Sequence, residues 1–166
     1  LLFYFLGEPK YIIILILSCI INYIISIKMD NTKYKKVLLI ISLVYNIGQL
    51  LIFKYTDFFI SNINQILNTK IPYLYIIMPI GISFFTFQTM SYSIDVYRGK
   101  FKAENNFLNF MTYVSMFPQL IAGPIVRYET VSDELHKREI TFEKFSSGFV
   151  RFLQGLFKKV LIANNV

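Results

Sequence analysis

The chain opens with two long uncharged runs joined by a short basic link. Residues 11–27 and 37–53 are each seventeen residues without a charge. That is about the shortest helix that spans the roughly 30 Å hydrocarbon core of a bilayer at about 1.5 Å per residue. The link, "KMDNTKYKK" at 28–36, holds four lysines and one aspartate. Short basic links stay on the cytoplasmic side, so we expect two membrane segments with this link inside the cell.

Two further apolar runs, 73–95 and 107–126, are interrupted by helix-breaking and polar residues. The first contains a proline, a glycine and Gln88, and a charged link at 98–106 follows it. Such a run can cross a membrane only where neighbouring protein or water satisfies its polar groups. We expect both runs to be membrane segments, with the charged link on the same side as the link at 28–36.

Two other stretches mix apolar and polar residues at helical spacing. Residues 54–70 are typical of a helix that lies in the membrane interface. At 142–163 we expect an amphipathic helix with Thr141 as N-cap and Lys144 at its third position. Basic residues beside its apolar stripe favour either the cytoplasmic membrane surface or a bundle helix with a basic end. The stripe consists of Phe145, Phe149, Phe152, Leu153, Leu156, Phe157, Val160 and Leu161.

Composition places these elements in a membrane protein. Of the 166 residues, 55% are hydrophobic and 16% charged, whereas soluble domains have about 25% charged residues. We expect an all-α fold, a polytopic transmembrane helix bundle with broken or re-entrant helices, in a bacterial plasma membrane that it crosses several times. The net charge of +7 is typical of cytoplasmic links, and no nucleic-acid partner is expected. Because the chain begins inside an apolar run without a methionine, we interpret residues 1–166 as one membrane domain from a longer protein.

The stretch "FPQLIAGP" at 117–124 is the strongest sign of a broken helix. Pro118 and Pro124 lack the N–H that a continuing helix needs, and residues that precede proline avoid the α region. We therefore expect Phe117 and Gly123 to be non-helical. Backbone groups freed in this way cannot face lipid, so they are buried in protein or line a wet cavity.

Two interpretations of this stretch stay open: a kinked helix packed in a bundle, or a re-entrant segment that lines a substrate tunnel. In the second, polar side chains near the breaks would meet a ligand. The candidates for the tunnel are Gln88, Pro118, Gln119, Gly123, Pro124 and Arg127.

The usual catalytic side chains are scarce. His136 lies in the charged stretch "DELHKRE" and is interpreted as a solvated side chain. Cys19 is a single cysteine within an apolar run, so it builds neither a disulfide nor a thiolate metal site. We predict no metal site and no catalytic residue within the chain itself.

Three motifs in order resemble the alginate O-acetyltransferase branch of the membrane-bound O-acyltransferase family. They are "MPIGISFFTFQTMSYSIDVYRG" at 78–99, "YVSMFPQLIAGPIVRY" at 113–128 and "FSSGFVRFLQGLFKKVLIA" at 145–163. The resemblance implies a membrane helix bundle that transfers an acetyl group from a cytoplasmic acyl thioester, such as acetyl-CoA, with no bound cofactor. The acceptor would be an exported polysaccharide or a partner acyltransferase outside the membrane. It also implies that the general base is a histidine beyond Val166, so the chain alone would be inactive.

Two other functions are compatible with a membrane protein of this kind. A secondary transporter also uses broken helices near the membrane midplane, and two broken stretches are present here. A non-catalytic fragment is the other alternative. The order of the three motifs favours the transferase.

Overall fold

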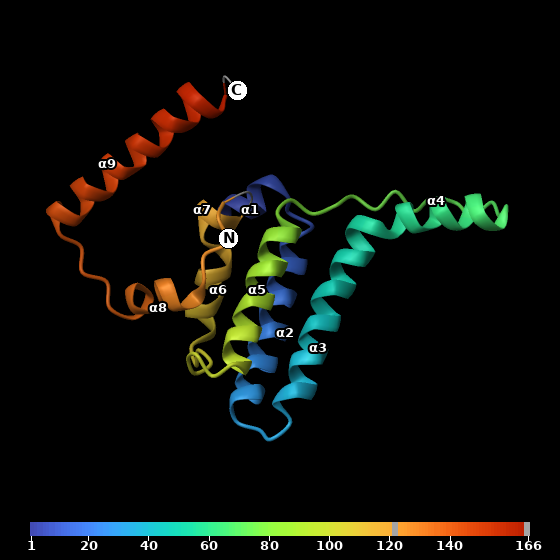
Figure 1. Ribbon diagram of the computed structural model, residues 1–166, viewed down its shortest axis with the longest axis horizontal. Coiled ribbons are helices and arrows are strands. Elements are labelled where there is room, and N and C mark those ends of the chain that lie inside the picture. The colour runs from blue at the N-terminus through green and yellow to red at the C-terminus, as the bar shows by residue number, and fades with distance from the viewer. Residues whose placement is uncertain (121–122, 165–166) are drawn as a thin grey trace. The chain divides into compact units, whose positions relative to one another are not determined.

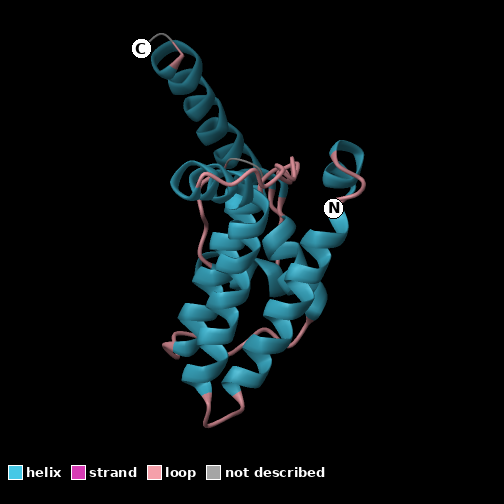
Figure 2. Cartoon of the chain, turned by 90° about the vertical axis from the view of Figure 1, so that its right-hand side faces the viewer, coloured by secondary structure: helices cyan, strands magenta, loops and turns pink. Residues whose placement is uncertain are grey.

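The computed structural model describes residues 1–120 and 123–164, and every regular element in them is a helix (Figures 1 and 2). The chain, expected to form one membrane domain, groups into two compact units, Leu1–Ser132 and Asp133–Val166. The all-helical class predicted from the sequence is confirmed for the described residues.

Three helices form the core of the first unit: α2 (Ile12–Asp30), α3 (Lys35–Leu50) and α5 (Ile82–Tyr97). They pack side by side in Figures 1 and 2, and each contacts the other two. A short helix, α1 (Leu2–Gly7), precedes them. The uncharged runs predict α2 and α3 well, because a run without charges and without helix breakers continues its backbone hydrogen bonds. Each belongs to a helix that is long and apolar enough to cross a membrane.

The second of these apolar helices continues beyond the uncharged run. A π-helical turn, η1 (Leu51–Tyr55), joins α3 to α4 (Thr56–Leu67), so that 33 residues from Lys35 to Leu67 form one helix. Figure 1 shows α4 leaving the three-helix core in a new direction. Wide helical turns of this kind bend helices. The helix predicted within 54–70 is therefore present, and it has no buried residue.

The run at 73–95 is helical only in its second part. Residues 68–79 belong to no helix, and α5 begins at Ile82. Gly81, at φ 74°, has the left-handed conformation that glycine adopts without strain, and it directly precedes the helix. The sixteen residues of α5 span about 24 Å, so this helix is shorter than the expected segment.

The stretch around Pro118 is broken, one residue earlier than expected. Helix α6 (Phe107–Ser115) ends before Met116, whose φ of −61° and ψ of 124° are extended. A four-residue helix, α7 (Phe117–Leu120), follows. The expectation that Phe117 is non-helical is wrong, because Pro118 falls in the first turn of a new helix, where its missing N–H leaves no bond unmade.

After this break the chain returns beside α6. The Tyr113 hydroxyl of α6 donates to the carbonyl of Val126 at 2.9 Å. Tyr128, the first residue of α8 (Tyr128–His136), donates through its hydroxyl to Glu104, which precedes α6. The two ends of the run at 107–126 therefore lie close together, as in a re-entrant hairpin. Gly123 is in a bend and in no helix, as predicted.

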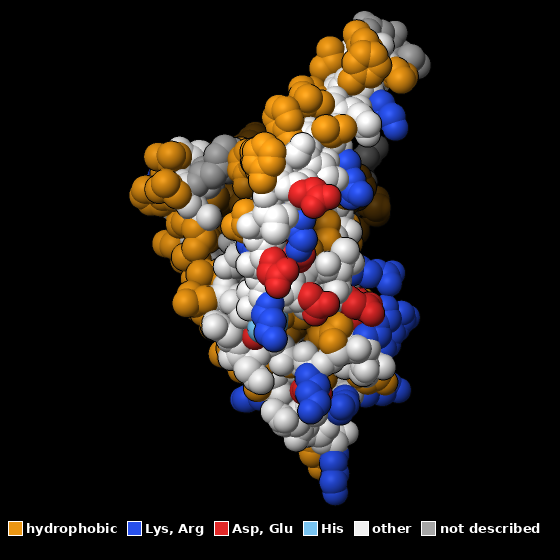
Figure 3. All heavy atoms as spheres, turned by 90° about the vertical axis from the view of Figure 1, so that its left-hand side faces the viewer, with side chains coloured by type: hydrophobic (Ala, Val, Ile, Leu, Met, Phe, Trp, Pro, Cys, Tyr) orange, Lys and Arg blue, Asp and Glu red, His pale blue; other side chains and the backbone are white. Residues whose placement is uncertain are grey.

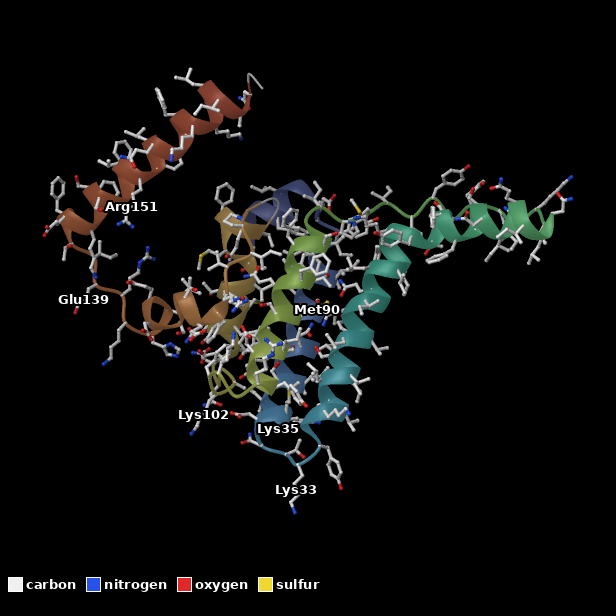
Figure 4. The ribbon with its side chains drawn as sticks, in the orientation of Figure 1. Lys33, Lys35, Met90, Lys102, Glu139 and Arg151 are labelled. Carbon is white, nitrogen blue, oxygen red and sulfur yellow. The ribbon has the colours of Figure 1, made fainter. Side chains whose placement is uncertain are left out.

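Both basic links of the first unit lie at one end of the three-helix core. The Ala103 N–H of the second link donates to the Asp30 carboxylate of the first at 3.2 Å. Figure 4 shows Lys33, Lys35 and Lys102 at this same end. At the opposite end, the Ile80 N–H donates to the Glu8 carboxylate at 2.8 Å. The two links, expected on one side of the membrane, therefore lie at one end of the core.

The second unit contains α9 (Phe142–Lys158), which continues into a π-helical turn, η2 (Lys159–Ala163). Thr141 caps α9 as predicted: its hydroxyl accepts from the Lys144 N–H at 3.2 Å. The described residues of this helix are exposed, and Figure 3 shows apolar and basic side chains along it.

Candidate functional site

Two of the predicted site residues meet at one backbone atom. The side-chain amide of Gln88, on α5, donates to the Tyr113 carbonyl at 2.9 Å. The amide of Gln119, on α7, donates to the same carbonyl at 2.6 Å. Both side chains are buried, with 1% and 4% of their surface exposed. Residues 25 and 6 positions from Tyr113 thus converge on it from two different helices.

The break in the helix explains why this carbonyl needs donors. In an unbroken helix the Tyr113 carbonyl would accept from the N–H of Phe117. Helix α6 ends at Ser115, and the extended backbone of Met116 turns the chain away before that bond can form. A buried carbonyl without a donor costs about 1–3 kcal/mol, and the two amides remove that cost. The sequence analysis expected backbone groups freed by the break to be buried in protein or to line a wet cavity. Here the freed Tyr113 carbonyl is buried and accepts hydrogen bonds from two glutamine side chains.

The other four predicted residues are not gathered at this point. Pro118 belongs to α7, and Gly123 is half-buried in the bend that follows. Pro124 and Arg127 are exposed. The structure therefore joins the two glutamines and leaves Arg127 outside their buried contact.

A second buried group, centred on Glu104, was not singled out from the sequence. One Glu104 carboxylate oxygen accepts from the Tyr128 hydroxyl, and the other accepts from the Asn106 N–H at 2.8 Å. The Glu104 N–H donates to the Tyr92 hydroxyl at 2.7 Å. Only 7% of Glu104 is exposed. In the sequence it sits in a charged link, where nothing local distinguishes it from a solvated carboxylate.

Aromatic rings pack around Tyr128, which donates to this carboxylate. The ring of Tyr128 packs edge-on against those of Tyr92 and Tyr113, with centroids 5.1 and 5.2 Å apart. Phe101 lies 5.0 Å from the Tyr128 ring. Burial, and then the hydrogen bond and negative charge of Glu104, raise the pKa of Tyr128 far above its ordinary value. The raised pKa favours the protonated hydroxyl, which is the form of Tyr128 that donates to Glu104.

A third polar group holds α2, α3 and α5 together. The Asn46 amide donates to the Oδ1 of Asn22 at 2.8 Å, and the Ser42 hydroxyl donates to the same oxygen at 3.0 Å. The Thr89 hydroxyl of α5 donates to the Oδ1 of Asn46 at 3.1 Å. All four side chains are fully buried. Interhelical hydrogen bonds between small polar residues commonly stabilise the packing of membrane helices. The hydrophobic effect does not drive this packing, because lipid tails are as apolar as the helix surfaces.

The single histidine and cysteine lie apart from these groups. His136 is exposed at the last position of α8, and Cys19 is buried in α2. Over residues 1–120 and 123–164, no three His, Cys, Asp or Glu side chains gather as metal ligands would. The buried amides and hydroxyls of the three groups can orient and hold polar partners, which is a positioning role rather than proton transfer to a reacting atom.

These features define a class of protein. It is an all-helical protein with two helices apolar enough to cross a membrane, and its broken third region is held by buried amides. Membrane proteins keep irregular backbone at depth only where protein or a cavity satisfies it.

Comparison with known proteins places the chain within this class. Over 155 residues it is 38% identical to the probable alginate O-acetylase of Pseudomonas aeruginosa, covering 89% of this chain and 30% of that protein. Over 195 residues it is 34% identical to the peptidoglycan O-acetyltransferase of Helicobacter pylori, covering 99% of this chain and 37% of that protein. Over 92 residues it is 47% identical to the probable alginate O-acetylase of Pseudomonas fluorescens, covering 55% of this chain and 19% of that protein. No family model and no solved structure matches the chain.

The chain belongs to the membrane-bound O-acyltransferase family, as its three motifs indicated. It spans about a third of the length of the curated relatives it matches. The names of these relatives are those of two probable alginate O-acetylases and a peptidoglycan O-acetyltransferase, which favours the transferase over the transporter.

Proposed function

We propose that this chain is part of a membrane O-acetyltransferase. In this proposal the enzyme moves acetyl groups from a cytoplasmic acyl thioester, such as acetyl-CoA, to a polysaccharide exported from a bacterial cell. The observation that carries the proposal is the similarity to alginate and peptidoglycan O-acetylating enzymes over as much as 99% of the chain. The broken, amide-held region between α6 and α8 supports it, because irregular membrane segments can shape a protected passage.

The proposed reaction explains why such a passage is useful. A hydroxyl oxygen of the acceptor attacks the thioester carbonyl, a C–O bond forms and the C–S bond breaks. The hydroxyl proton passes to a base and then to the departing thiolate, and donors stabilise the negative oxygen between these steps. Water competes as a nucleophile, so a narrow, dry passage protects the thioester. In this proposal the base is a histidine outside this chain, as the family resemblance implies.

Within this chain, the proposed role of Gln88 and Gln119 is to position one wall of that passage. Both amides fix the end of α6 where the chain turns back. Gly123, Pro124 and Arg127 come after that turn, and Arg127 is exposed and so free to meet a charged donor or acceptor. The partner outside the membrane would be the glycan itself or an acyltransferase that passes the group on.

The direct test is the O-acetyl content of the surface polysaccharide after deletion of the gene. We expect the acetyl content to fall and to return when the intact gene is supplied. An unchanged acetyl content in the deletion strain would contradict the proposal. Supplying the gene with its predicted catalytic histidine replaced provides the control for loss of the protein alone.

The role of the break is tested by replacing both prolines, Pro118→Ala and Pro124→Ala, in the complete protein. We expect acetyl transfer to fall at least tenfold, whereas the amount of protein in the membrane falls less. The physical reason is that restored N–H groups allow α6 to continue, which removes the turn without emptying the core. Normal transfer by a well-expressed double variant would show that the break has no part in the reaction.

A further inference from the structure

A cavity of about 400 Å³ opens between α2 and α3, away from the two glutamines of the broken region. This volume falls in the range of about 300–1,000 Å³ that is typical of small-molecule sites. Its lining is apolar except for one amide and one phenol. The lining residues are Ile14, Leu17, Val44, Tyr45, Gly48, Gln49, Ile52 and Phe53.

Gln49 gives this cavity a polar group that could hold a ligand. Its side chain is only 7% exposed, yet neither its amide oxygen nor its amide nitrogen has a hydrogen-bond partner among the described residues. One turn earlier on the same face, Asn46 makes several bonds to Asn22, Ser42 and Thr89. An unpaired buried amide costs several kcal/mol in an apolar environment. A group that donates and accepts hydrogen bonds is therefore expected beside Gln49.

Gly48 keeps the space beside Gln49 open. A Cβ added at this position would meet no atom within 4 Å. The cavity is thus wide enough at this level to take a side chain, or an equivalent part of a ligand, without displacing backbone.

The depth of the cavity indicates which ligand suits it. It lies at the end of α3 opposite the basic links, and Tyr11 packs edge-on against Phe53 at that end, with centroids 6.4 Å apart. Aromatic side chains gather where hydrocarbon meets headgroups. Gln49 is four residues, or about 6 Å, deeper than Phe53 along the helix. At this depth a glycerolipid carries its ester groups, with its acyl chains below them.

Apolar side chains in and beside the cavity are also exposed on the outside of the helices. Ile13 of α2, Val44 of α3 and Ile52 of η1 are about half exposed or more. An acyl chain can therefore enter from the surrounding bilayer without crossing a polar barrier.

From these observations we propose that the cavity between α2 and α3 binds a membrane glycerolipid. The acyl chain fills the apolar part, the ester carbonyl accepts from the Gln49 Nε2, and a lipid hydroxyl or its bound water donates to the Gln49 Oε1. This site does not rest on the proposed acetyl transfer, because binding requires neither donor nor acceptor.

The test uses the complete protein in nanodiscs that contain phosphatidylglycerol with a photoreactive diazirine in one acyl chain. After irradiation and digestion, mass spectrometry locates the labelled peptides. We expect label on the cavity side of α2 and α3 that persists under a tenfold excess of an unlabelled ether-linked lipid, which dilutes lipid in passing contact but lacks the ester carbonyl that the Gln49 amide is proposed to bind.

Two variants block the site by independent means: Gly48→Phe fills the cavity, and Gln49→Leu removes the amide. We expect each to reduce the persistent label about fivefold. Ile47→Phe is the matched control, because Ile47 is exposed and does not line the cavity, and it should leave the label unchanged. Size-exclusion chromatography checks that each variant is folded.

Two results would overturn the proposal. One is label spread over the exposed faces of both helices and indifferent to Gly48→Phe. The other is a cavity filled by protein instead of lipid. A photoreactive residue placed at Val44 would then crosslink to another segment of the protein or to a second copy, and no lipid label would be found in the cavity.

Discussion

At the scale of residues, the Tyr113 carbonyl shows how this chain handles a broken helix. Two side-chain amides from different helices donate to it, at 2.9 and 2.6 Å. A carbonyl has two lone pairs, so both bonds can form at once. Either amide alone is enough to avoid an unpaired buried acceptor, and the two residues are therefore coupled energetically.

The first prediction concerns this shared acceptor. Gln88→Leu and Gln119→Leu are each expected to cost about 1 kcal/mol, the usual value of one hydrogen bond, and the double variant about 3 kcal/mol or more. The excess arises because only the double variant leaves the Tyr113 carbonyl without a donor from either glutamine. The unfolding temperatures of the complete protein in detergent rank the two single variants and the double variant by stability.

Gln65→Leu is the control for this pair, because Gln65 is exposed on α4 and should tolerate the change. Strictly additive losses in the double variant would mean that the two amides act independently.

A second prediction concerns the buried carboxylate. Tyr128→Phe removes the hydroxyl that donates to Glu104 and keeps the ring that packs against Tyr92. We expect a loss of about 1–3 kcal/mol, because one carboxylate oxygen is left buried without that donor. Thermal unfolding again provides the measurement, and Tyr97→Phe, at a more exposed tyrosine, is the control. Equal stability of the two variants would show that the Tyr128 hydroxyl contributes nothing.

At the scale of elements, α2, α3 and α5 are joined by hydrogen bonds between polar side chains as well as by the packing of apolar side chains. Asn46 is central: it donates to Asn22 and to the Ser42 carbonyl of its own helix, and it accepts from Thr89. Measured interhelical hydrogen bonds in membranes contribute about 0.6 kcal/mol each on average, so several are needed to fix the helices.

The third prediction compares two asparagines with the same local bond. Asn46→Leu should cost about 2–3 kcal/mol, because several bonds are lost and the buried side chains of Asn22 and Thr89 lose partners. Asn62→Leu is the matched control: its amide donates to the Phe58 carbonyl four residues back at 2.8 Å, and it is not buried. Asn46 makes the equivalent bond to the Ser42 carbonyl, so the difference between the variants reports the burial of Asn46 and its remaining bonds, to Asn22, Thr89 and the Ser42 hydroxyl. Similar unfolding temperatures for the two would contradict this role of Asn46.

The helices of the first unit also show which local signals are reliable. Uncharged runs predict α2 and α3, and Thr141 predicts the start of α9. Proline signals a break near 118 but not its position, because proline is disfavoured inside a helix and tolerated in a first turn. Whether Pro118 ends α6 or begins α7 depends on the packing of both against α5.

At the scale of the whole molecule, the return of the chain beside α6 favours a re-entrant run at 107–126 over a run that crosses the membrane. If 107–126 crossed the membrane, Arg127 and the residues after it would face the side opposite the link at 98–106. Tyr128 instead touches Glu104 of that link, so both ends of the run lie at one end of the core.

The fourth prediction tests this topology by cysteine labelling of the complete protein in a Cys19→Ala background. Thr32→Cys, Lys102→Cys and Thr130→Cys should react with a membrane-impermeant maleimide only after the cytoplasmic side is opened. Lys70→Cys should react from outside, because it lies in the segment between α4 and α5, beyond the opposite end of α3. Labelling of Thr130→Cys from outside would mean that the run at 107–126 crosses the membrane after all.

By itself, the sequence determined the all-helical class, the two apolar helices, the basic links, the presence of a break near Pro118 and, through its motifs, the family. These features have local causes: charge is excluded from a long apolar run, and proline lacks an N–H. Only the tertiary structure decided that Gln88 and Gln119 share the Tyr113 carbonyl, that Glu104 is buried among tyrosines and that the chain turns back beside α6. Those outcomes depend on which distant groups come within hydrogen-bonding distance, and the selection is made by packing between helices, which no local pattern of residues specifies.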